Sequence, residues 1–257
     1  MASTLPRSAI GRALVSIVIS VGVSGVSAQG ARGGQSPTAA TPRAAAPFDL
    51  TGYWVSVVSE DWAWRMVTPR KGDYSSVPLN DEGRRAADGW DPAKDEASGN
   101  QCRSYGAGHI MRVPGRVHIT WDDDTTLRIE TDAGQQTRLL RFGAPPPSGE
   151  PDWQGHSLAS WDVARGGRGA PPPRSGSLKV VTTRMKPGYL RKNGVPYSES
   201  AVITEYFDRH MEASGDWFTV TTIVDDPKYL AQPFITSSDF RKEPDGSKWR
   251  PVPCAAR

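Results

Sequence analysis

The stretch GVPYSESAVITEYFDR, residues 194–209, decides the fold class of this chain. It opens with Gly and Pro, which favour a turn, and then runs into the β-branched and aromatic residues typical of a strand. Successive side chains of a strand point to opposite faces, so Ile203, Glu205 and Phe207 share one face. If that face is the core, Glu205 is a buried carboxylate and needs a partner, because desolvating it alone is costly.

The sequence does not identify a single partner for Glu205. Arg209 lies on the same face but about 13 Å along the strand, so direct pairing would need a bulge. Arg138 and Arg184, on neighbouring strands, are the alternatives, and we expect a cross-strand basic group or a tyrosine beside the carboxylate. The contact is then either a structural ion pair or a general acid or base whose pKa burial has altered.

The rest of the chain reads as more strands separated by turns. Alternating apolar and polar residues bounded by Gly, Pro and Asp are the signal for half-buried antiparallel strands. The segments with this pattern are residues 48–58, 60–67, 117–121, 127–131, 136–142, 153–162, 177–185, 200–209, 216–224 and 233–241.

One helix is expected among these strands. Asn80 followed by Asp81 and Glu82 is a helix N-terminus with acids in the first turn, and it predicts a short helix ending near Asp88. The fold class is therefore all-β: an antiparallel barrel or barrel-like sandwich of about nine or ten strands, with one short helix.

The two ends of the chain set the domain boundaries. Arg7 and Arg12, an apolar run over residues 13–26 and small residues before Gln29 predict a signal peptide over residues 1–28. Residues 29–47 are rich in Ala, Gly, Pro, Ser and Thr and predict a flexible linker. Residues 48–257 then form a single β domain, exported to the periplasm or the cell exterior.

The composition and net charge limit the classes of partner that this chain is expected to bind. The formal net charge is +3, and it falls to +1 once Arg7 and Arg12 are removed with the signal peptide. No basic cluster suited to nucleic acid is present, and no later stretch is apolar enough to insert into a membrane. Nine Trp residues in a chain of this size would fill a core or line a pocket for a flat or apolar ligand.

The two cysteines, Cys102 and Cys254, are expected to form a disulfide, because the chain reads as exported and contains no third cysteine. A closed loop of this size would stabilise the fold by about 4–5 kcal/mol in the chain-entropy model. Two cysteines with no neighbouring His pair make a poor zinc site.

The order of short motifs from Cys102 onward resembles a family of uncharacterised exported bacterial proteins with a lipocalin-like β-barrel. The matching motifs are Cys102, residues 110–114, residues 126–138, residues 155–161, residues 194–198, residues 204–207, Asp226-Pro227 and Pro253-Cys254. The Gly52-Tyr53-Trp54 triplet also matches the Gly-x-Trp pattern of the first strand of lipocalin-like barrels. The resemblance covers roughly 150 residues and implies an antiparallel barrel or barrel-like sheet. It departs in the arm over residues 60–101 and in the Pro-rich insert over residues 164–176.

Three functions remain open. The first is binding of a small apolar or aromatic molecule, for which the candidate residues are Trp54, Trp62, Trp64, Trp161, Tyr197 and Arg138. The second is a cofactor-independent isomerase, lyase or hydrolase that uses His156 and Glu205 as acid and base. The third is an interaction subunit whose arm, residues 60–101, docks a partner.

Other chemistry is not expected. His156 and Ser157 are neighbours on one strand and point to opposite faces, which argues against a Ser nucleophile. The four His residues form no spaced pair, so no metal site is expected, and the sequence contains no dinucleotide or phosphate-loop fingerprint, so no cofactor is expected.

Overall fold

A computed structural model describes residues 40–143, 145, 148–163 and 175–257. The predicted signal peptide and most of the predicted linker lie outside these residues. None of the helices within the described part of the chain is long and apolar enough to cross a membrane.

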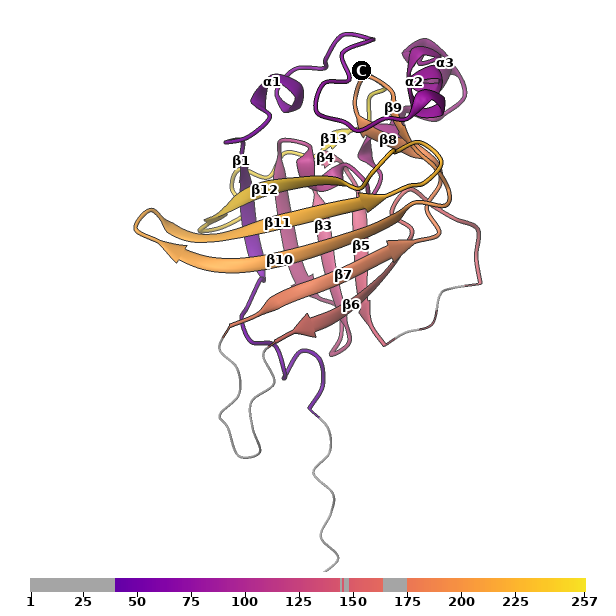
Figure 1. Ribbon diagram of the computed structural model, residues 1–257. Helices are drawn as coiled ribbons and strands as arrows, with labels where there is room; N and C mark the ends of the chain where they lie inside the picture. Colours follow the sequence, from indigo (N-terminus) through magenta and orange to yellow (C-terminus); the bar gives the residue numbers. More distant parts are fainter. Residues whose placement is uncertain (1–39, 144, 146–147, 164–174) are drawn as a thin grey trace, which may run out of the picture. The chain divides into compact units, whose positions relative to one another are not determined.

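Nine strands close into a barrel in the order β1-β12-β11-β10-β7-β6-β5-β3-β2 (Figure 1). Their bounds are β1 Gly52–Val57, β2 Arg116–Trp121, β3 Thr126–Thr131, β5 Thr137–Phe142, β6 His156–Asp162, β7 Ser177–Thr183, β10 Val202–Glu212, β11 Gly215–Asp225 and β12 Phe234–Glu243. The expected all-β fold with a closed barrel is confirmed.

The barrel is mixed rather than purely antiparallel. Eight of its ladders are antiparallel, but β5 and β6 run parallel, with Leu140 opposite Ser157. The cause is the connection between Phe142 and His156, which is long enough to return the chain to the end where β5 began. A two-residue hairpin could only have joined antiparallel neighbours.

The helical segments belong to the arm and to the segment that follows it. They are α1 Trp62–Arg65, α2 Asp81–Asp88 and α3 Pro92–Ala97, then the 3₁₀ turns η1 Gln101–Tyr105 and η2 Ile110–Arg112. The predicted helix is confirmed as α2: the Asn80 side chain accepts a hydrogen bond from the Gly83 amide at 2.8 Å, as an N-cap does.

The strand expected over residues 60–67 is wrong, because this segment forms α1. Asp61 has a φ of 52°, which breaks the extended chain just before Trp62. A segment this short is compatible with the periodicity of a helix and with that of a strand, so tertiary contacts decide which one forms. As a helix, the segment buries Arg65 against the carbonyl of Arg112 at 3.0 Å.

Two small ladders lie outside the barrel. β8 Gly188–Arg191 pairs antiparallel with β9 Val195–Tyr197, and β4 Ala133–Gly134 pairs in parallel with β13 Val252–Pro253. Next to β13, Cys254 forms the predicted disulfide with Cys102, which has an S–S distance of 2.05 Å. Helices α1–α3 gather with β8 and β9 at one end of the barrel, here called the covered end (Figure 1).

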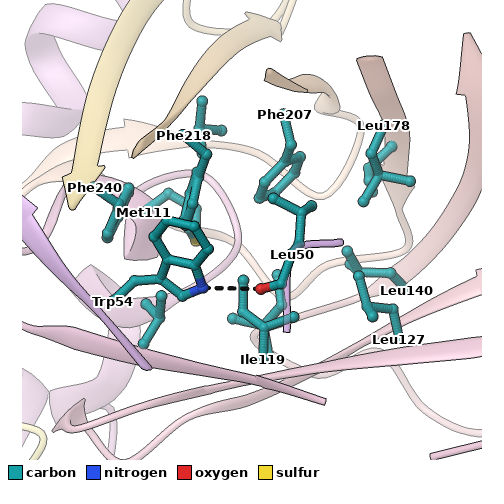
Figure 2. Packing of buried hydrophobic residues seen from close by; sticks show 14 of the residues in the cluster. Leu50, Trp54, Met111, Ile119, Leu127, Leu140, Leu178, Phe207, Phe218 and Phe240 are labelled. Atoms are coloured by element: carbon teal, nitrogen blue, oxygen red, sulfur yellow. Dashed lines mark hydrogen bonds between the residues drawn. The ribbon is translucent and has the colours of Figure 1, made fainter. Parts of the chain in front are cut away.

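Large side chains fill the barrel interior. Trp54, Phe207, Phe218 and Phe240 are each at most 1% exposed, and the Trp54 indole N–H donates to the Leu50 carbonyl at 2.8 Å (Figure 2). Met111, from η2, packs into the same cluster. The interior of this barrel is thus a packed core, which is one of the two states that barrels with so few strands adopt, the other being a cavity for one small ligand.

Candidate functional site

The tryptophans predicted to bind a ligand lie at separate places. Trp54 is in the core, whereas Trp161 packs edge-on against Phe48 and donates its indole N–H to the Pro42 carbonyl at 2.8 Å. Trp62 is 67% exposed. Trp64 stacks under the guanidinium of Arg191, with 4.8 Å between Cζ and the ring centroid. The structure brings none of these four together around a cavity.

Glu205 faces inward, as alternation predicted, and its partner is the cross-strand Arg138. Both side chains are fully buried and the contact is bidentate, at 3.1 Å to Oε1 and 2.6 Å to Oε2. Arg209 instead pairs with Asp216 at 2.6 Å. Both oxygens of Glu205 are therefore committed to an ion pair inside the core.

His156 does not converge on Glu205. The hydroxyl of its neighbour Ser157 lies 2.8 Å from the Thr182 hydroxyl, which in turn accepts from Arg138 at 3.4 Å inside the barrel. Alternation then directs His156, which pairs with Thr183 in the ladder, to the opposite face of the sheet. The two residues named for acid and base chemistry are thus on different sides of the barrel wall.

A cavity of about 290 Å³ opens at the covered end, between α2–α3 and the β8–β9 hairpin. Four aromatic side chains form much of its wall: Trp90, Tyr189, Tyr197 and Tyr229. Its size is at the lower end of the range seen for small-molecule sites. Of the residues that the sequence singled out as ligand-binding, only Tyr197 lies here.

A carboxylate network fixes one wall of this cavity. Asp95, on α3, accepts from the Tyr189 hydroxyl at 2.7 Å and from Arg103 Nη1 at 2.9 Å. Arg103 Nη1 also donates to the Tyr189 hydroxyl at 3.1 Å. Burial, followed by the hydrogen bond to Asp95, raises the pKa of Tyr189, so the phenol stays protonated and donating.

Two buried donors of the cavity wall have no hydrogen-bond partner among the described residues. They are the Tyr197 hydroxyl and the Trp90 indole N–H. Burial also raises the pKa of Tyr197, which keeps its hydroxyl a donor. Buried polar groups without partners are uncommon in native proteins, so both donors mark positions in the wall where the described residues supply no acceptor.

Glycines create the space for these rings. A Cβ on Gly106 or Gly188 would lie 2.2 or 2.5 Å from the Tyr197 hydroxyl, and one on Gly194 would lie 2.2 Å from Trp90 Cβ. Gly194 also has a φ of 83°, which side chains rarely adopt. The turn at the start of residues 194–209 therefore shapes the cavity.

Sequence reasoning missed most of this wall. Trp90, Asp95 and Arg103 lie in the arm or beside it, where no regular strand pattern predicts which way a side chain points. The available signal was Gly188 and Gly194 on either side of Tyr189, because glycines next to aromatic residues often mark close approach of backbone and ring.

No group of three or more His, Cys, Asp or Glu residues within the described ranges could hold a metal ion. Comparisons of this chain with protein-family models, with curated proteins and with solved structures find no match. The geometry of the covered end is therefore the basis for a proposed function.

Proposed function

We propose that this protein binds a small aromatic molecule, and that it does so in the cavity between α2–α3 and the β8–β9 hairpin rather than in the barrel interior. The observation that carries the proposal is a wall of four aromatic side chains that includes two unpartnered donors, the Tyr197 hydroxyl and the Trp90 indole N–H. Aromatic walls with a few placed polar groups are the usual make-up of small-molecule sites.

The wall also selects for an acceptor on the ligand. A ring that stacks on tyrosine would bring a carboxylate or hydroxyl oxygen to the wall that holds the two buried donors. A shift of the surrounding side chains would then let these donors gain the hydrogen bonds that the described residues do not supply. Arg85, Lys94 and Arg103 add positive charge around the opening, whereas Asp95 is bonded to Arg103 and Tyr189, and Asp91 pairs with Lys94 at 3.6 Å. An aromatic carboxylate of the size of benzoate fits this chemistry.

The expected affinity is modest. Burial of about 150 Å² of ring surface at about 25 cal/mol per Å² contributes about 4 kcal/mol, equivalent to a Kd of about 1 mM. Two satisfied hydrogen bonds of about 1 kcal/mol each would bring the Kd to about 30 µM. Titrations should therefore span the range from micromolar to millimolar ligand.

The test is to block the cavity from its rim. Ala86 is exposed on α2 and lines the cavity, so Ala86→Trp can fill the space without disturbing the core. Isothermal titration with benzoate should show binding to the original chain and a loss of at least tenfold in affinity for Ala86→Trp, with little change in melting temperature.

The matched control is Ala97→Trp, which adds the same ring to an exposed site at the end of α3 that does not line the cavity. This variant should bind benzoate as the original chain does. Equal affinities for Ala86→Trp and the original chain would place the ligand elsewhere. No measurable binding of benzoate, phenol or indole would remove the proposal.

Export is the second part of the proposal. A positively charged start, an apolar run and small residues before Gln29 support a cleaved signal peptide, and the Cys102–Cys254 disulfide suits an oxidising compartment. The intact mass of the secreted chain should correspond to a start at or near Gln29. A secreted chain that retains Met1 would contradict the signal peptide.

A further inference from the structure

Three buried arginines meet beside α1, on elements far apart in the sequence. Arg65 ends α1, Arg112 ends η2 and Arg191 ends β8, and their exposed fractions are 6%, 2% and 1%. Arg65 Nε donates to the Arg112 carbonyl at 3.0 Å, and the charge of Arg112 acts on both other guanidinium groups. The three side chains therefore form one cluster, here called the arginine cluster.

Most of its hydrogen-bonding capacity is unused. Arg65 Nη1 bonds Glu60, and Arg112 Nη2 bonds Asp61 Oδ2 at 2.7 Å. Six other guanidinium nitrogens are buried with no hydrogen-bond partner in the part of the chain that the structure describes: Nη2 of Arg65, Nε and Nη1 of Arg112, and all three nitrogens of Arg191. A buried guanidinium normally has its donors satisfied, because leaving a charged group unpaired is expensive.

The nearby acids do not bond all three arginines. Glu60 and Asp61 each pair with one arginine, and among the described residues no carboxylate lies in hydrogen-bonding contact with Arg191. The charges of Asp61 and Asp73 still act on Arg191, and Asp73 accepts from the Trp64 indole N–H at 3.1 Å. Burial, followed by the charge of Arg112, lowers the pKa of Arg191 to about 10. Arg191 is thus a buried cation whose guanidinium no carboxylate among the described residues bonds directly.

A second cavity, of about 380 Å³, reaches this cluster at Arg65. Arg65 lines it together with Tyr105, Lys192 and Arg250. Lys192 follows Arg191 in the chain and donates to the Tyr105 hydroxyl at 3.0 Å. Asp132 is the one acid in the wall, and its carboxylate bonds the Arg116 amide at 2.7 Å. The charged side chains that line this cavity are therefore three cations and one acid, among mostly apolar neighbours.

We propose that the arginine cluster is a binding site for a phosphate-type oxyanion, either free phosphate or the phosphate group of a small monoester that enters through the cavity of Arg65 and Lys192. Guanidinium groups match the oxygens of phosphate in geometry and charge, and a dianion would both satisfy the free donors and give Arg191 the directly bonded anion that it lacks. This site is separate from the aromatic cavity, and the inference does not depend on the proposed function.

Arg191 is the residue to change, because its guanidinium stacks on Trp64 but makes no hydrogen bond to the described residues. The melting temperature should be measured in millimolar sodium phosphate and in sodium chloride of equal ionic strength, since a ligand of the folded state stabilises it by mass action. We expect a concentration-dependent rise in phosphate for the original chain and none for Arg191→Met. In chloride, Arg191→Met should melt at or above the temperature of the original chain, because it removes an unpaired buried cation.

Two further variants keep the test decisive. Arg191→Lys retains the charge but loses the planar fork, so its apparent affinity for phosphate in calorimetric titration should fall at least tenfold even if Arg191→Met does not fold. Arg84→Met removes an exposed arginine of α2 and should leave phosphate binding unchanged. Ala86→Trp, which blocks the aromatic cavity, should also leave it unchanged.

Phenyl phosphate and inorganic phosphate distinguish the two sources of the anion. Tighter binding of phenyl phosphate would assign the site to a monoester whose organic group occupies the cavity, and equal binding would assign it to phosphate itself. Two outcomes would overturn the proposal. One is a response to phosphate no larger than that to chloride. The other is the same phosphate affinity in Arg191→Lys as in the original chain.

Discussion

At the scale of single residues, the Glu205–Arg138 pair is the main polar feature of the barrel interior. Alternation along residues 202–209 was enough to predict that Glu205 faces inward, because Ile203 and Phe207 on the same face are strongly apolar. It was also enough to expect a cross-strand cation, although it could not choose between Arg138 and Arg184. Ladder register makes that choice, and register depends on turns and packing that a single strand does not encode.

Glu205→Gln should therefore act on stability rather than on chemistry. It leaves the Arg138 charge buried without a counter-charge, so we expect a loss of about 3–5 kcal/mol in the free energy of unfolding, measured by urea denaturation. Benzoate binding at the covered end should persist in the folded fraction. Asp216→Asn breaks the part-exposed pair with Arg209 and should cost only about 1 kcal/mol or less.

The pair can be removed as a unit. Arg138→Met combined with Glu205→Leu replaces both charges by apolar groups, so the double variant should recover most of the stability that Glu205→Gln loses. Full stability in Glu205→Gln itself would contradict the structural role and favour a functional one.

His109 makes the fold sensitive to acid. It is 4% exposed, and Nδ1 donates to the Ser104 carbonyl at 2.8 Å. Burial, helped by the charges of Arg112, Lys192 and Arg65, lowers its pKa to about 3. In the unfolded chain this imidazole has its ordinary pKa of about 6.5. At a pH between the two pKa values, the unfolded state therefore binds a proton that the folded state does not bind.

The direction in which stability changes with pH follows from this difference in pKa between the folded and unfolded states. The contribution of His109 to stability is complete above about pH 6.5 and declines as the pH falls towards 3, by about 1.4 kcal/mol per pH unit. Between pH 7 and pH 5 the loss from this one group is about 2 kcal/mol. Urea denaturation at both pH values should show that His109→Gln loses less stability on acidification than the original chain. An equal loss in both proteins would show that His109 does not carry the effect.

At the scale of elements, the strands were easier to predict than the arm. Strands β2, β3 and β5 were visible because Gly and Asp turns bound short alternating runs. The arm has no such repetition, and Trp62, Trp64 and Met66 suggested a strand where α1 forms. The exposed faces of Trp62, Met66 and Val67 on and after α1 are the feature that an interaction role of the arm would use.

The parallel pairing of β5 with β6 was also beyond the sequence. Local patterns indicate where a strand begins and ends, but the direction of pairing depends on the path of the connection between them. The disulfide, in contrast, needed only the count of cysteines and an exported context, and it holds the β13 segment near β4 and η1. Covalent and local features were thus predictable, and the path of long connections was not.

At the scale of the whole domain, the barrel serves as a scaffold and the covered end carries the candidate sites. Aromatic and aliphatic side chains pack the interior (Figure 2). Phe48 and Trp161 pack against the same core. The arm, η1, η2 and the β8–β9 hairpin then supply the aromatic cavity and the arginine cluster at one end of this packed barrel. Binding residues are commonly found on such irregular segments, which a regular scaffold holds in place.

The most direct test of this arrangement is nuclear magnetic resonance of the labelled protein during addition of benzoate, with the Trp90 indole signal assigned by Trp90→Phe. We predict that benzoate shifts the Trp90 indole N–H and the Tyr189 amide, while the methyl signals of Ile119 and Leu140 inside the barrel stay in place. Shifts of Ile119 and Leu140, with Trp90 unchanged, would contradict the account and return the ligand to the barrel interior.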